Sequence, residues 1–156
     1  MKKVILFGSI VVLIFVALIV VSNINSSQKA AGNPFEKDRL DPATIELLDD
    51  PNYQNVILPS ELAEKMANEE TATVYFYSPK CAFCKEATPT LVQLTDEKGI
   101  DLVQYNVLEF EEGWDAYNID STPTVIHFEN GVEVQRIVGL APEQEYNQFF
   151  DEYVVN

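Results

Sequence analysis

The two cysteines of this chain stand three residues apart, at positions 81 and 84 of the segment KCAFCK. They directly follow an apolar run, Thr73–Tyr77, so the pattern predicts a strand that leads into a helix opening at the cysteine pair. Residues i and i+3 share one helix face, which lets the two sulfurs close and open a disulfide and exchange it with another molecule. The pair therefore predicts a thiol-disulfide exchange site on a strand-helix unit.

A second constraint lies at the start of the chain, where Val4 to Val21 contains no charged residue and follows Lys2 and Lys3. As a helix this run would be about 27 Å long, close to the hydrocarbon thickness of a bilayer. We interpret residues 1–21 as a single-pass transmembrane anchor that crosses the cell membrane through residues 4–21. A cleaved signal peptide is the alternative. In both cases the two lysines favour the cytoplasmic side, and the following domain is expected on the extracytoplasmic side.

The charge of the remaining chain limits its partners. The protein has 10 basic and 25 acidic residues, and without Lys2 and Lys3 the formal net charge is −17. Such a surface repels nucleic acids and anionic lipid head groups, so a nucleic-acid function is excluded. Solubility explains the acidic excess most simply, and a preference for basic partner proteins is the sharper alternative.

The segment before the main pattern has the composition of a spacer. Residues 22–40 begin with a stretch, 22–34, that is rich in Ser and Asn and has linker composition; they predict a linker, so that the folded domain would span residues 41–156. Asp41 and Pro42 are typical of the N-cap and first turn of a short helix. A short strand is expected at Asn55–Leu58, followed by a helix capped by Ser60.

The rest of the chain alternates between strand and helix patterns. The expected elements are a strand at 73–77, a helix from 81 to about 97, a strand at 101–107, a short helix near 113–117, strands at 124–128 and 132–138, and a helix from Pro142. Their order is βαβαββα. An Asn-Gly pair predicts a hairpin between the last two strands. In the final helix Tyr146, Phe149, Phe150 and Tyr153 form an apolar stripe that we assign to the core.

These motifs together resemble the thioredoxin superfamily, in particular small membrane-anchored thioredoxin-like proteins of bacteria. The similarity covers roughly residues 55–154 and includes the C-x-x-C pair, Pro89 in its helix, Thr122-Pro123, the turn 128–131 and Gly139. The resemblance implies an α/β, thioredoxin-like fold with a mixed central sheet flanked by helices, placed behind an N-terminal transmembrane helix. It also implies a protein thiol-disulfide oxidoreductase.

The resemblance assigns roles to individual residues. Cys81 would be the nucleophile, because unpaired amides and the dipole at a helix N-terminus stabilise a thiolate. Cys84 would be the more buried resolving thiol, with a higher pKa. Pro123 would be a cis-proline that, with Thr122, lets the backbone bind an extended substrate segment. Lys80 and Lys85 are candidates for lowering the pKa of Cys81, or they are ordinary solvated lysines.

Departures from the family pattern bear on the direction of exchange. Reducing thioredoxins carry Trp before the first cysteine, Gly-Pro between the two, and a buried Asp behind them. Here those places hold Lys80, Ala82-Phe83 and Tyr75. A standard cytosolic reductase is therefore a poor match, and the flanking lysines favour disulfide formation, because stabilising the reduced thiolate makes a disulfide more oxidising.

Other kinds of site have little support in the sequence. Two cysteines and the single His127 are too few for a structural zinc site, and Lys85 stands where a c-type haem motif needs His. No metal or cofactor is therefore expected. His127 is interpreted as a surface or partly packed strand residue. Glu109, Glu111 and Glu112 are interpreted as a solvated acidic face.

Three functions remain open at this point. In the first, the exported domain forms disulfides in secreted or membrane proteins and is regenerated by a membrane redox partner. In the second, it reduces such proteins outside the cytoplasm. In the third, the domain binds extended polypeptides without catalysis and the cysteines are incidental. The position of the C-x-x-C pair at a helix start favours the enzyme, and its expected partners are thiol- or disulfide-containing exported proteins.

Overall fold

The structure, a computed structural model, describes residues 11–19 and 32–155. In the second range its elements are α2 (Pro42–Ile45), the 3-10 helix η1 (Pro51–Tyr53), α3 (Pro59–Ala67), β1 (Ala72–Tyr77), α4 (Ala82–Lys98), β2 (Leu102–Asn106), α5 (Glu112–Ala116), β3 (Thr124–Glu129), β4 (Val132–Val138) and α6 (Glu143–Tyr153). From β1 onward this is the predicted order βαβαββα. The hairpin at Asn130-Gly131 is also confirmed.

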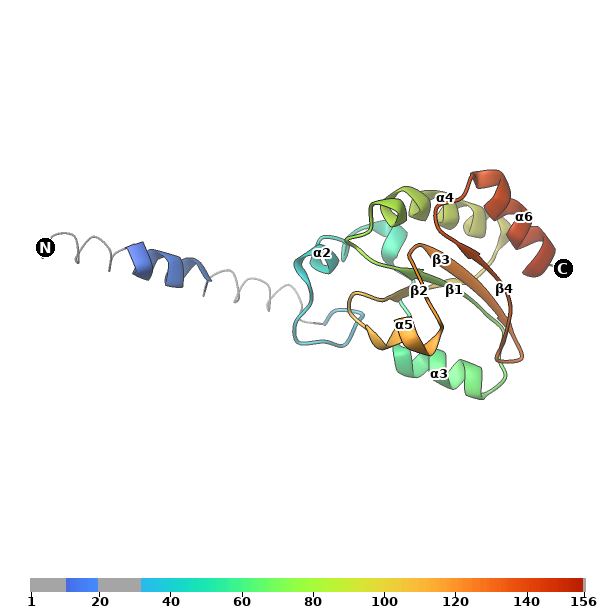
Figure 1. Cartoon of the computed structure of the whole chain (residues 1–156), viewed down its shortest axis with the longest axis horizontal. Coiled ribbons are helices and arrows are strands. Elements are labelled where there is room, and N and C mark those ends of the chain that lie inside the picture. Colours follow the sequence, from blue (N-terminus) through green and yellow to red (C-terminus); the bar gives the residue numbers. More distant parts are fainter. Residues whose placement is uncertain (1–10, 20–31, 156) are drawn as a thin grey trace, which may run out of the picture.

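The four strands form one mixed sheet in the order β2-β1-β3-β4. β1 pairs with β2 in parallel and with β3 antiparallel, and β3 pairs with β4 antiparallel. Helices α4 and α6 cover one face of this sheet and α3 and α5 the other (Figure 1). A strand covered on both faces has no solvent side, which is why all six residues of β1 are buried.

Successive residues of β1 point into two separate cores. Val74 and Phe76 pack with Leu62 of α3, whereas Tyr75 and Tyr77 pack with Cys84 and the apolar residues of α4 and α6. The stripe predicted in the last helix belongs to this second core: its residues Tyr146, Phe149 and Phe150 are buried and Tyr153 packs against them. The cysteine pair is therefore anchored to the more aromatic of the two cores.

The expected strand at residues 55–58 does not form. Only Val56 makes a bridge to the sheet, a parallel contact with Gln104. The helix that follows begins at Pro59, one residue before the expected cap Ser60, because proline suits the first turn of a helix. Its N-cap is Leu58, whose backbone N–H donates to the Glu61 carboxylate at 2.8 Å.

Part of the predicted linker 22–40 packs against the domain. Phe35 and Leu40 are only 4% and 8% exposed, and both belong to the core on the α3 side of the sheet. Burial of two large apolar side chains offsets the entropy lost by ordering this stretch. Residues 22–31 of the predicted linker lie outside the described residues. The predicted cap of α2 is confirmed, since the Asp41 carboxylate accepts from the Ala43 N–H.

Residues 11–19 are helical, and their large apolar side chains are exposed. Within the described residues, no helix has both the length and the apolar character that a membrane crossing requires. Half of the predicted anchor at residues 4–21 lies outside the described residues, which begin at position 11 and break after 19.

Candidate active site

The site begins where β1 ends and α4 starts. Cys81 has an extended backbone and is the N-cap of α4, so its sulfur faces the unpaired amides of the first turn. Its Sγ accepts the N–H of Cys84 at 3.3 Å, and the Cys81 N–H donates to the Ser78 carbonyl at 3.0 Å. Cys81 is partly exposed, whereas Cys84 is completely buried one turn further on. One sulfur is accessible and the other is not.

The surroundings of the two thiols shift their pKa values in opposite directions. Partial burial acts to raise the pKa of Cys81, but hydrogen bonds with the Thr122 side chain, with Cys84 and with the Phe83 backbone outweigh it and bring the pKa below its ordinary value. Burial raises the pKa of Cys84 to about 11. Near neutral pH, Cys81 is thus the thiol that more readily forms the thiolate, which is the form that attacks a disulfide.

The loop before β3 lies next to the accessible sulfur. The Thr122–Pro123 peptide bond is cis, as the resemblance implied. The Cys81 thiol donates to the Thr122 carbonyl at 3.2 Å, and the Pro123 carbonyl accepts from the Gly139 N–H at 2.7 Å. The structure therefore brings Thr122 of the predicted substrate-binding pair into contact with the predicted nucleophile, and Pro123 follows it across the cis bond.

The two lysines flanking the cysteines have different surroundings. Lys80 forms an ion pair with Asp41, with 2.6 Å between Nζ and Oδ2, and its side chain is 58% exposed. Lys85 is exposed on α4. Their influence on the pKa of Cys81 stays a prediction. Sequence reasoning treated Asp41 only as a helix cap, and its pairing with Lys80 had no signal in the local pattern.

Hydroxyl groups surround the inner end of the cysteine pair. The Tyr75 hydroxyl lies 2.9 Å from the Thr88 hydroxyl, which donates to the Cys84 carbonyl at 2.7 Å. Burial, reinforced by the nearby Cys84, raises the pKa of Tyr75 well above its ordinary value, so the phenol stays protonated. Tyr75 was predicted from the family pattern to lie here. Thr88 was not, although it stands one turn after Cys84 on the same helix face.

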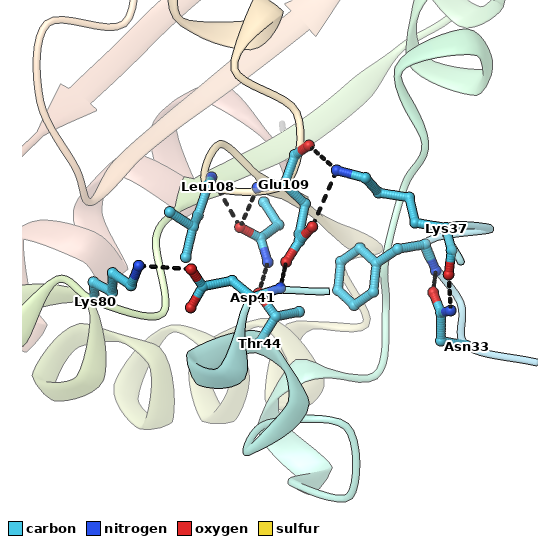
Figure 2. Close-up of polar contacts among 9 residues, drawn as sticks. Asn33, Lys37, Asp41, Thr44, Lys80, Leu108 and Glu109 are labelled. Atoms are coloured by element: carbon cyan, nitrogen blue, oxygen red, sulfur yellow. Dashed lines mark hydrogen bonds and ion pairs between the residues drawn. The ribbon is translucent and has the colours of Figure 1, made fainter. Parts of the chain in front are cut away.

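The sequence interpretation of two residues outside the site is wrong. Glu111 and Glu112 are exposed as expected, but Glu109 does not lie on a solvated face: it is 8% exposed and binds Lys37 and the backbone of Asp41 (Figure 2). His127 is not a surface residue: it is 2% exposed, and its Nδ1 lies 2.9 Å from the Thr73 hydroxyl. In the described part of the chain no three His, Cys, Asp or Glu residues are arranged to hold a metal ion.

Comparison with known proteins agrees with this geometry. The family model described as Thioredoxin matches residues 54–152. The chain is 33% identical to a thioredoxin of Mycoplasma genitalium over 92 residues, which cover 58% of this chain and 90% of the relative. It is 30% identical to thioredoxin C-2 of Corynebacterium nephridii over 114 residues, or 72% of this chain and 98% of the relative.

A solved structure shows the same fold. A mutant thioredoxin from Halobacterium salinarum superposes with a TM-score of 0.56 at 22% identity, over 66% of this chain and 92% of that one. The family match contains the sheet, the cysteine pair and the cis-proline loop described above. The chain belongs to the thioredoxin family and is a thiol-disulfide oxidoreductase.

Proposed function

We propose that this protein is a membrane-anchored enzyme that forms disulfides in exported proteins. The observation that carries the direction is the set of hydrogen bonds around the Cys81 sulfur, which stabilise its thiolate. Anything that stabilises the reduced form of the pair makes its disulfide a stronger oxidant. Cys81 is partly exposed beside the Thr122-Pro123 loop, and this is where we expect an extended polypeptide that carries the substrate thiols to bind.

The reaction proceeds by two thiol-disulfide exchanges. A substrate thiolate attacks the Cys81 sulfur of the Cys81–Cys84 disulfide, and Cys84 leaves as a thiolate that takes up a proton. A second substrate thiolate then attacks the substrate sulfur of the mixed disulfide, and Cys81 leaves as a thiolate. The two substrate thiols lose two electrons and two protons: both electrons go to the enzyme, one proton is taken up by Cys84, and the other goes to solvent because Cys81 stays a thiolate. A membrane redox partner then reoxidises the dithiol.

The reduction potential of the cysteine pair tests the direction. The full chain in non-ionic detergent is equilibrated with glutathione buffers, and the fraction of dithiol is measured by thiol alkylation and mass. If the protein is an oxidase, we expect a reduction potential of about −120 mV. A value of about −270 mV would establish the alternative, an extracytoplasmic reductase. A Cys81→Ser variant, which cannot form the disulfide, is the control for background labelling.

Export and anchorage rest on the uncharged run Val4–Val21 behind two lysines, and on the exposed apolar side chains of residues 11–19. Intact cells producing the full chain are treated with a membrane-impermeant maleimide after mild reduction. We expect Cys81 to be labelled before lysis, and the protein to stay with the membrane after an alkaline wash. Labelling only after lysis would refute export, and release by the wash would refute the anchor. The Cys81→Ser variant again measures background.

A further inference from the structure

A chain of polar contacts runs from the N-terminal segment of the domain to the residue before the nucleophile. Figure 2 shows its members in the order in which they contact one another: Lys37, Glu109, Asp41 and Lys80. Lys80 directly precedes Cys81 in the chain. The contacts therefore end at the residue that directly precedes the nucleophile, although none of the four residues belongs to the cysteine pair or its cis-proline loop.

Glu109 is the fixed end of this chain. Its carboxylate is only 4% exposed, and each oxygen has a partner: Oε1 accepts the Asp41 N–H at 2.8 Å, and Oε2 accepts from Lys37 at 3.1 Å. The same ammonium also donates to the Glu109 carbonyl and lies 5.3 Å from the centre of the Phe110 ring. A buried charge is tolerated when it is paired in this way, so Glu109 holds the Asp41 backbone in a defined place.

The side chain of Asp41 connects this fixed backbone to Lys80. Its Oδ1 caps α2 by accepting the Ala43 N–H at 2.9 Å, and its Oδ2 accepts from the Lys80 ammonium at 2.6 Å. The contact with Lys80 lowers the pKa of Asp41, so the carboxylate is charged throughout the range in which thiols titrate. The ammonium of Lys80, the residue before Cys81, is thereby paired and held toward α2.

We propose that Asp41 is a positioning residue of the exchange site, which pairs with the ammonium of Lys80, the residue directly before Cys81, and offsets its charge, and that residues 33–41 are in this sense part of the active site. This inference rests on the thiol chemistry of the proposed function, but neither on its direction nor on the membrane anchor. Other titratable groups around Cys81 are Cys84 on its own helix and Tyr53 of η1.

Two opposite substitutions test the proposal. The measured quantity is the pH midpoint of the alkylation rate of Cys81, in the reduced full chain in non-ionic detergent with iodoacetamide as the probe. Asp41→Asn keeps a helix cap and leaves the Lys80 charge unpaired. We therefore expect the midpoint to fall, and the alkylation rate of Cys81 at pH values below the midpoint to rise about two-fold. Lys80→Gln leaves the Asp41 charge unpaired, so the midpoint rises and that rate falls by a similar factor.

The double variant and salt separate this mechanism from a general structural effect. Asp41→Asn combined with Lys80→Gln restores a neutral pair and returns the midpoint to that of the unmodified protein, and both single shifts shrink at high ionic strength because exposed charges are screened. Shifts in the same direction, or no shift in Lys80→Gln, would overturn the proposal. Lys80 is exposed enough that its substitution leaves the fold intact even if Asp41→Asn does not.

A matched control removes a similar ion pair elsewhere. Lys98 and Asp151 form a partly exposed pair that joins α4 to α6 at their far ends. Asp151→Asn should leave the Cys81 midpoint unchanged. The unmodified protein separates failure of this proposal from failure of the proposed function. If its Cys81 had an ordinary midpoint, Cys81 would not be the activated nucleophile and the proposed function would fail. If its midpoint were lowered but the two single variants did not shift it in opposite directions, only the role of Asp41 would be contradicted.

Discussion

At the scale of single residues, small differences in position decide chemical behaviour. Cys81 and Cys84 are the same residue type three positions apart, yet the pKa of the first is lowered and that of the second is raised to about 11. The first caps the helix and accepts amide hydrogen bonds, and the second is inside it and has no access to water. The sequence predicts this asymmetry because a cap and a first-turn position differ in burial and in free amides.

Two glycines with similar backbone angles provide a test of residue-scale packing. Gly131 has φ +74° and Gly99 has φ +67°, but a Cβ at Gly131 would lie 2.3 Å from the Met66 carbonyl, whereas one at Gly99 meets nothing within 4 Å. Gly99→Ala should lower the free energy of unfolding by about 1–2 kcal/mol, the cost of the left-handed conformation. Gly131→Ala should cost about 1–3 kcal/mol more because of the collision. Equal losses in chemical denaturation would contradict this packing.

At the scale of elements, the segment before α2 behaves as part of the domain. Phe35 is buried against Phe110, with ring centroids 6.2 Å apart, and Lys37 reaches the buried Glu109. Its composition, rich in polar and turn-forming residues, predicts a linker. That prediction considers local composition alone, and two apolar anchors among polar neighbours are enough to dock a segment on an existing core.

A pair of phenylalanine variants measures this docking. Phe35 is 4% exposed and Phe83, between the two cysteines, is 58% exposed. Phe35→Ala should lower the free energy of unfolding by about 3–5 kcal/mol, as expected for truncation of a buried aromatic side chain. Phe83→Ala should change it by less than about 0.5 kcal/mol. If denaturation of the full chain gave equal values for the two, residues 33–40 would not be packed on the domain.

At the scale of the whole molecule, the sheet explains where the site lies. β1 is flanked by β2 and β3 in the sheet and by helices on both faces, so it is a rigid support for the residues that follow it. The cysteines leave its carboxyl end, and the Thr122-Pro123 loop enters the neighbouring strand β3 at the same end. Pairing of these two strands thus brings Thr122 to the sulfur of Cys81, although the two residues are 41 positions apart in the chain.

The amino-acid sequence alone determined the order of elements from β1 onward, the cap of α2, the start of a helix at the cysteine pair, the hairpin and the difference between the two thiols. Each of these depends on neighbours within a few positions, where periodicity and capping act. Tertiary structure alone decided that Glu109 and His127 are buried, that residues 33–40 dock, and that Lys80 pairs with Asp41. Those contacts join residues 39 to 72 positions apart. Burial and charge pairing at such separations are set by how the elements pack, which no local pattern contains.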